Sequence, residues 1–288
     1  MYLERGPMTL GEHEEGQARL DGQVALVTGA GRGIGRAISL ALSEVGASVA
    51  VCARAWDEVS WTAREVTERN GRAMAVKADV SSREEVEVMV GEVEERLGPV
   101  DLLVNNAARA GTVGPIAATD PDEWWQTLEV NLRGPLYCSR AVLPGMLARG
   151  RGRIVNVSSG AGFAAWPMVS AYAVSKAALF RLSENLAAET RGQGVHVFAI
   201  DPGLVRTAMS EGALSCGNPT VEQTFQNWFA SGADVPPERA ARLVAYLASG
   251  KADVLSGRYI SVNADVRQMV ANVSDIDERD LYVLRQRE

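Results

Sequence analysis

Two side chains that can transfer a proton together lie in the segment Tyr172-Ala173-Val174-Ser175-Lys176. On a helix, residues four apart share one face, so the phenol and the ammonium are expected to be neighbours. A nearby cation favours the phenolate and can bring the pKa of a tyrosine down from about 10. The pair therefore predicts general acid–base chemistry at an alcohol or a ketone.

A hydroxyl group is available at the end of an apolar run upstream of this pair. The run Ile154 to Ser159 ends in two serines, Ser158 and Ser159, and Ser159 lies 13 residues before Tyr172. A hydroxyl at this strand end could polarise a substrate carbonyl. The spacing alone does not decide between the two serines.

A glycine-rich turn lies between the first predicted strand and the first predicted helix. It reads Thr28-Gly29-Ala30-Gly31-Arg32-Gly33-Ile34-Gly35. Glycines let a backbone approach phosphate groups closely, and the helix that follows directs free N–H groups and its positive dipole end toward them. The turn predicts a dinucleotide site that includes Gly29, Gly31, Arg32, Gly33, Ile34 and Gly35.

The end of the second predicted strand indicates which dinucleotide binds. An acidic residue there would accept hydrogen bonds from a ribose 2′-hydroxyl and repel a 2′-phosphate. The sequence instead reads Val51-Cys52-Ala53-Arg54. Arg54, helped by Arg32, could hold the extra phosphate by charge-assisted hydrogen bonds. We expect NADP(H) in preference to NAD(H).

Short β-branched runs alternate with helical stretches from residue 23 onward, which is typical of parallel βαβ units. Strands are expected at 24–28, 48–52, 73–78, 102–105, 154–158, 195–200 and 259–262, and helices at 34–45, 57–70, 82–97, 121–149, 170–191 and 236–249. The fold class is α/β: a single-domain, doubly wound parallel sheet of the Rossmann type with three αβα layers. Ligands of such sheets bind at the carboxyl ends of the strands.

Three segments do not follow this alternation of strands and helices. Residues 1–20 are expected to be a flexible leader before a dehydrogenase/reductase domain at 21–263, and residues 264–288 a C-terminal extension on the surface or on a neighbouring subunit. Residues 203–235 mix Gly, Ser, Asn and Pro with isolated aromatics. They are expected to form an irregular insertion that acts as a substrate lid.

Bulk composition excludes several classes of function. A formal charge of -7 and a pI near 5.1 disfavour nucleic acid and anionic membranes as partners. No apolar run reaches the ~18 residues of a membrane-spanning helix, and no secretory signal is evident. Three separated cysteines and two histidines favour a reducing, cytoplasmic setting and no metal site.

Over about residues 21–263 the chain resembles the classical short-chain dehydrogenases/reductases, on the strength of the glycine turn and the Tyr172–Lys176 pair. The resemblance implies a catalytic tetrad of Asn131, Ser159, Tyr172 and Lys176, and so selects Ser159 over Ser158. Asn131 would hold a water that links the lysine to solvent, and Lys176 would also bind the nicotinamide ribose.

The same resemblance assigns further cofactor contacts. It implies adenine contacts at Asp79 and Val80, a structural and ribose-side role for Asn105 and Ala107, and nicotinamide contacts at Pro202, Gly203, Val205 and Thr207. It also implies a homodimer or homotetramer that associates through the helices at 121–149 and 170–191.

The chain departs from the family pattern at several positions. Asn105-Asn106-Ala107 is followed by Ala108 where the family has glycine, Asp201 precedes the Pro-Gly pair, and Phe198 replaces a frequent asparagine. Asn263-Ala264-Asp265 stands where the family often has Asp-Gly-Gly. The departures concern the C-terminal packing and the subunit contacts, and the tetrad is complete.

Large apolar side chains gather in the two segments between which the family binds its substrate. They are Phe163, Trp166, Met168, Met209, Phe225, Trp228 and Phe229. They either form a pocket for a hydrophobic substrate or pack the lid onto the domain. The expected function is an NADP(H)-dependent oxidoreductase that interconverts a hydrophobic ketone and a secondary alcohol; the alternative is a non-catalytic NADP(H)-binding regulatory or scaffold protein.

Overall fold

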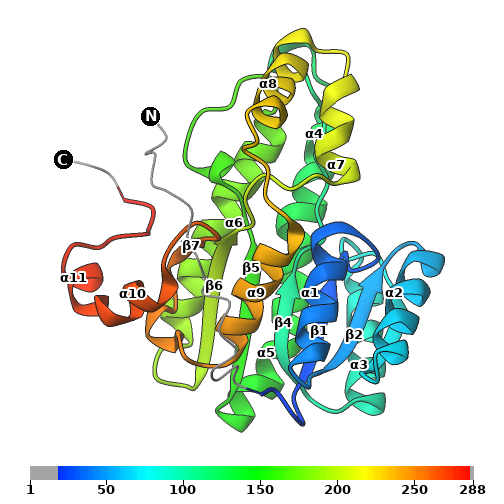
Figure 1. Ribbon diagram of the computed structural model, residues 1–288, viewed down its shortest axis with the longest axis vertical. Coiled ribbons are helices and arrows are strands. Elements are labelled where there is room, and N and C mark those ends of the chain that lie inside the picture. The colour runs from blue at the N-terminus through cyan, green and yellow to red at the C-terminus, as the bar shows by residue number, and fades with distance from the viewer. Residues whose placement is uncertain (1–18, 286–288) are drawn as a thin grey trace.

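A computed structural model describes residues 19–285 and contains one seven-stranded sheet (Figure 1). The strands are β1 (Val24–Thr28), β2 (Ser48–Ala53), β3 (Arg72–Lys77), β4 (Val100–Asn105), β5 (Gly152–Val157), β6 (Val195–Asp201) and β7 (Tyr259–Ser261). All paired strands are parallel, in the order β3-β2-β1-β4-β5-β6-β7. The predicted doubly wound sheet is confirmed.

Helices cover both faces of the sheet, which is why the central strands β1 and β4 are buried along their whole length. One face packs on α1 (Gly33–Glu44), α2 (Trp56–Glu68) and α9 (Pro237–Ala248). The other packs on α3 (Arg83–Arg96), α5 (Gly134–Arg149) and α6 (Ser170–Glu189). All five residues of β1 are buried, and the carboxyl end of this strand leads into the glycine turn.

The helix expected over 121–149 is interrupted. It consists of α4 (Pro121–Leu128) and α5, joined by a π-helical turn at Glu129–Arg133 in which the N–H of Gly134 donates to the carbonyl of Glu129. Pro135 has no N–H to donate to the carbonyl of Asn131, which favours the wider turn. The turn contains Asn131, whose side chain is fully buried.

Residues 203–235 are more regular than expected. They contain α7 (Ala208–Gly212) and α8 (Pro219–Ala230), so the prediction of an irregular insertion is wrong. The side chain of Asn218 accepts hydrogen bonds from the N–H groups of Thr220 and Val221, and Pro219 begins the helix. This N-cap followed by proline is a strong helix start that composition alone does not reveal.

The C-terminal segment contributes to the core of the same chain. It forms α10 (Val266–Ala271) and α11 (Val273–Glu278), which bury Val266, Met269 and Ile276 against the α9 face of the sheet. Arg258 forms ion pairs with Asp277 and Asp280. Figure 1 shows α10 and α11 at the left, beside β7.

Replacement of Ile276 tests the contribution of this segment. The side chain is 3% exposed, so Ile276→Ala should lower the free energy of unfolding by about 2–4 kcal/mol through lost burial and a residual cavity. Urea denaturation measures the change. Val254→Ala is the control, because Val254 is 55% exposed, and equal effects of the two substitutions would contradict the packing described above.

Candidate active site

Tyr172 and Lys176 lie on the first two turns of α6, beside the carboxyl end of β5. The Lys176 side chain is 3% exposed and its Nζ donates to the carbonyl of Val157 at 2.8 Å. The same Nζ is 5.5 Å from the centroid of the Tyr172 ring. The four-residue spacing thus places the ammonium beneath a partly exposed phenol.

Burial dominates the ionisation of both groups. It raises the pKa of Tyr172 to about 12; a hydrogen bond with Ser159 acts in the opposite direction, and the carboxylate of Asp201 raises the pKa further. Burial lowers the pKa of Lys176 to about 8. The expected fall of the tyrosine pKa is therefore not seen, because desolvation of the phenolate outweighs the hydrogen bond with Ser159.

The structure distinguishes the two serines. The Ser159 hydroxyl forms a hydrogen bond with Tyr172 and accepts the N–H of Ala161 at 3.2 Å. Ser158 is buried, and its hydroxyl donates to the backbone carbonyl of Lys176 at 3.1 Å. Ser159 therefore faces the phenol, whereas Ser158 fixes α6 to the sheet.

Asn131 connects the π turn to α6. Its Oδ1 accepts the N–H of Arg109 at 2.8 Å, and its Nδ2 donates to the Arg109 carbonyl at 3.0 Å and to the Ser175 hydroxyl at 2.9 Å. Ser175 in turn donates to the carbonyl of Tyr172 at 2.7 Å. The Asn131 side chain thus makes its hydrogen bonds with protein groups. Ser175 connects it to Tyr172.

The glycine turn forms a concave surface of backbone atoms, a cradle with no room for side chains at its glycine positions. A Cβ on Gly29 would lie 2.7 Å from Cα of Ala107, and one on Gly35 would lie 2.4 Å from the carbonyl oxygen of Gly29. Gly29 and Gly33 adopt positive φ angles of 61° and 54°. The first N–H groups of α1 have no partner within the helix, so the turn fits a pyrophosphate group.

Asn106 holds this cradle closed, a role the sequence analysis did not assign. Its Nδ2 donates to the carbonyls of Thr28 and Gly29 at 2.9 and 3.0 Å. The Thr28 hydroxyl accepts the N–H groups of Asn106 and Ala107, both at 3.1 Å. The second asparagine of the Asn105-Asn106 run was the available signal, since an amide can bridge two carbonyls.

The two arginines assigned to a 2′-phosphate are exposed and each has an acidic neighbour. Arg32 Nη1 lies 3.5 Å from Glu58 Oε1, and Arg54 Nη1 lies 3.7 Å from Asp79 Oδ2. Burial alone would raise the pKa of Asp79, but hydrogen bonds from Ser81 and the charge of Arg54 bring it below its usual value. These long, exposed pairs are weak, so the guanidinium groups stay available to an anion.

Several residues expected to contact the cofactor are buried or partly buried. Asn105 is 2% exposed and its Nδ2 donates to Asn156 and, more weakly, to Ser139. Val80 is buried against Gly134, Ile34 packs on the core, and Gly31 lies against Glu58. Asn105 therefore has a structural place in the sheet, and an adenine could meet Val80 only through its backbone or its edge.

The segment from Pro202 to Thr207 lies against the glycine turn. The nearest side-chain atom to a Cβ on Gly33 would be Cγ2 of Thr207, at 3.2 Å. Thr207 also begins α7 through a reciprocal capping box with Ser210. Pro202 and Val205 are buried, and Gly203 has a φ of 73°. The two cofactor segments thus meet in space.

The apolar side chains of the substrate region form an aromatic cluster. The rings of Trp166 and Trp228 stack with centroids 5.6 Å apart, and Phe225 lies 5.2 Å from Trp228. Phe229 packs on Phe225 and lies beneath the guanidinium of Arg206. These contacts attach α8 to the loop after Ser159. In this conformation the aromatic side chains therefore pack the expected lid onto the domain, which is the second of the two alternatives given above.

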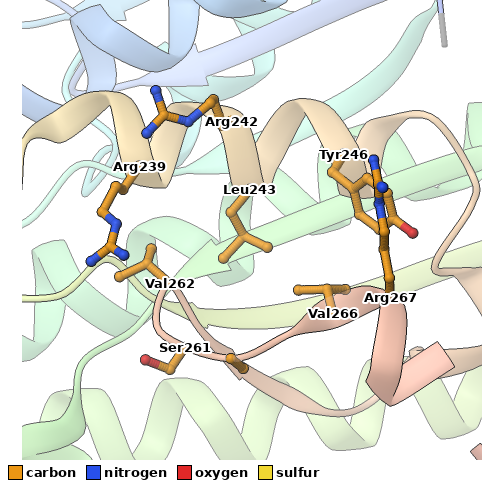
Figure 2. A pocket seen from close by; sticks show the side chains of 9 residues that line it. Arg239, Arg242, Leu243, Tyr246, Ser261, Val262, Val266 and Arg267 are labelled. Atoms are coloured by element: carbon orange, nitrogen blue, oxygen red, sulfur yellow. The ribbon is translucent and has the colours of Figure 1, made fainter. Parts of the chain in front are cut away.

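A groove lies between α9, β7 and α10, and Cγ2 of Val262, which lines it, would be 3.1 Å from a Cβ on Gly203. Figure 2 shows Arg239 and Arg267 at opposite ends of it and Leu243, Val262 and Val266 along its floor. None of the tetrad side chains lines the groove, and the guanidinium groups do not converge. Within residues 19–285, no cluster of His, Cys, Asp or Glu could hold a metal ion, and no helix is long and apolar enough to cross a membrane.

Comparison with known proteins gives the family. The model of the short chain dehydrogenase family matches residues 23–215. The chain is 36% identical over 260 residues to a short chain dehydrogenase of Pseudocercospora fijiensis, covering 88% of this chain and 84% of the relative. It is 34% identical over 245 residues to meso-2,3-butanediol dehydrogenase of Serratia marcescens, covering 85% and 94%. The chain belongs to the short chain dehydrogenase family of oxidoreductases.

Solved structures of the same fold carry different cofactors. A gluconate 5-dehydrogenase from Burkholderia cenocepacia, in complex with NADP and tartrate, superposes with a TM-score of 0.78 at 29% identity, covering 88% of this chain and 98% of that one. An NAD⁺-bound xylitol dehydrogenase gives 0.78 at 27% identity, covering 84% and 97%. The fold and the family are therefore compatible with either dinucleotide.

Substitution at Gly35 tests the cradle. The Cβ of Gly35→Ala would collide with the Gly29 carbonyl and with Asn106, and relief of this overlap should widen the turn and weaken dinucleotide binding about tenfold or more. Quenching of protein fluorescence by NADPH measures the affinity. Gly91→Ala, in α3 with no atom within 4 Å of the added Cβ, is the control, and an unchanged affinity in Gly35→Ala would refute the assignment.

Proposed function

We propose that this chain is an NADP(H)-dependent oxidoreductase that interconverts a ketone and a secondary alcohol, with a hydrophobic substrate. One observation carries the proposal: the Tyr172 phenol is hydrogen-bonded to Ser159, close to the buried ammonium of Lys176. Polar and ionisable groups concentrated next to a glycine cradle are what proton transfer beside a bound dinucleotide requires.

The side chains divide the proton chemistry among them. In the reductive direction the Tyr172 hydroxyl donates its proton to the carbonyl oxygen, and in the oxidative direction the phenolate accepts the alcohol proton. Ser159 donates a hydrogen bond to the same oxygen and stabilises the charge that develops there. Lys176, protonated below its pKa of about 8, favours the phenolate electrostatically. Bound nicotinamide supplies or accepts the hydride.

The residues that would hold the dinucleotide follow from the geometry of the two segments. The N–H groups of the turn from Gly29 to Gly35 would receive the pyrophosphate, and the Pro202–Thr207 segment would border the nicotinamide. Arg32 and Arg54 would pair with a 2′-phosphate in place of Glu58 and Asp79. Because no carboxylate ends β2 at the ribose position, NADP(H) is favoured over NAD(H).

The substrate assignment rests on the aromatic cluster of Trp166, Phe225, Trp228 and Phe229. Its members come from the loop after Ser159 and from α8, the two sides of the expected substrate path. A hydrophobic substrate would have to displace part of these contacts when it binds. The named activity of the Serratia relative concerns a secondary alcohol, which agrees with the proposed reaction.

We further propose a homodimer or homotetramer that associates through α5 and α6. Leu136 and Leu147 on α5 and Val174 on α6 are 43%, 37% and 45% exposed. Apolar side chains left in water on neighbouring helices are typical of surfaces that a partner covers.

Tyr172→Phe tests the catalytic assignment. Loss of the acid–base hydroxyl should lower kcat for apolar ketones about 10²–10⁴-fold, while NADPH affinity stays close to that of the unmodified chain. The assay is NADPH oxidation, run beside butane-2,3-diol oxidation with NADP⁺. Tyr246→Phe on α9 is the matched control. Full turnover by Tyr172→Phe would exclude the mechanism, and tight NADPH binding without turnover of any substrate would favour the regulatory alternative.

Arg54→Asp tests the choice of cofactor. The substitution removes a phosphate partner and adds a repelling charge, so NADPH affinity should fall about 10–100-fold relative to NADH. Dissociation constants for both dinucleotides are measured by fluorescence titration. Arg64→Asp, an exposed position further along α2, is the control. Equal affinities for NADPH and NADH in the unmodified chain would already contradict the arginine argument.

A further inference from the structure

The carboxylate of Asp201 receives hydrogen bonds from three separate segments. The N–H of Gly203 donates to its Oδ1 at 3.1 Å. The N–H of Gly160 and the side chain of Tyr259 also form hydrogen bonds with it. Asp201 ends β6, Gly160 lies in the loop after β5, and Tyr259 begins β7. One side chain therefore connects the carboxyl ends of β5 and β6 with the amino end of β7.

The Asp201 side chain is partly buried, at a position that disfavours its charged form. Burial raises the pKa of Asp201 above its ordinary value, and the three donors act against that rise. A buried carboxylate is tolerated only where donors replace its lost hydration. Neither an arginine nor a lysine is among the causes of the shift in the pKa of Asp201, so the stabilisation comes from the three donors.

The two loops bound by Asp201 each carry a part of the proposed reaction centre. Gly160 directly follows Ser159, whose hydroxyl contacts Tyr172. Gly203 starts the segment that reaches the glycine turn at Thr207. The hydrogen bonds from Gly160 and Gly203 fix the loop after Ser159 and the Pro202–Thr207 segment to the same carboxylate.

Tyr259 is itself held in place by packing and by the C-terminal segment. Its ring contacts Phe163 and Phe180, with centroid distances of 4.4 and 5.3 Å. Its backbone N–H donates to the carbonyl of Tyr282 at 2.9 Å. The hydroxyl that reaches Asp201 is therefore oriented by residues of the extension as well as by α6.

We propose that Asp201 is a positioning residue that fixes the Ser159 loop and the Pro202–Thr207 segment at the distance that hydride and proton transfer require, with Tyr259 orienting it. This inference rests on the function proposed above. The ionisable groups that face the carboxylate are Tyr259 from β7 and, through space, Tyr172 from α6. The glycines contribute only backbone donors.

Asp201→Asn tests the proposal with little change in shape. It replaces one carboxylate oxygen by an NH₂ group. An NH₂ group cannot accept the hydrogen bond of the donor that faces it. Hydrogen exchange followed by mass spectrometry should show faster exchange in the peptides that contain residues 159–163 and 202–207, because local opening there becomes easier. We expect kcat for ketone reduction to fall about tenfold while KM changes less than about threefold, the signature of lost transition-state geometry.

The pH profile separates positioning from a general loss of structure. Because the Asp201 carboxylate raises the pKa of Tyr172, its removal should move the alkaline fall of ketone reduction to lower pH. Tyr259→Phe, which keeps the ring against Phe163 and Phe180, should change exchange and kcat in the same direction but less. Tyr246→Phe is the control for loss of a tyrosine hydroxyl and should change neither.

Unchanged exchange in either peptide of Asp201→Asn would overturn the proposal, whatever the turnover. If Asp201→Asn does not fold, Tyr259→Phe decides, and exchange equal to that of the unmodified chain in both peptides overturns the proposal. Hydrogen exchange requires no substrate. A chain that fails to reduce any ketone, yet shows faster exchange in both peptides of Asp201→Asn, would support the positioning role and refute the proposed function.

Discussion

All paired strands of the sheet run in the same direction, and this constraint decides where chemistry can occur. Parallel strands are joined by helical crossovers, so helices cover both faces of the sheet. The helices do not cover the ends of the strands. The carboxyl ends of β1, β5 and β6 lead to the glycine turn, to Ser159 and to the Pro202–Thr207 segment. Segments separated by more than 100 residues in the chain are neighbours because their strands share one sheet edge.

Two ionisable side chains at this edge of the sheet are largely removed from water. Lys176 and Asp201 both lie in surroundings that disfavour their ionised forms, and each is compensated by backbone groups. Tyr172 lies above the Lys176 ammonium. Burial and the Asp201 carboxylate raise its pKa, and the hydrogen bond with Ser159 lowers it. Such opposed effects are characteristic of sites where a proton must leave and return.

Much of this arrangement could be predicted from the sequence, because it depends on local spacing. The Tyr172–Lys176 interval, the glycine turn and the alternation of apolar runs each indicate their structure without reference to distant residues. The π turn around Asn131 could not be predicted in this way, because helical periodicity does not register the missing donor at Pro135. Similarly, Asp201 was recognised only as a departure from a pattern, since two of its three donors, Gly160 and Tyr259, are remote from it in sequence. The contribution of Ile276 to the core was hidden by the charged residues around it.

The contact between the C-terminal segment and β7 has a consequence for solubility. β7 is the last strand of the sheet, and the outward N–H of Tyr259 is already bonded to the carbonyl of Tyr282. An exposed strand edge is a template on which another chain can add a strand and begin aggregation. At Tyr259 the extension occupies that template with the chain's own backbone, so strand addition between molecules would first have to displace it.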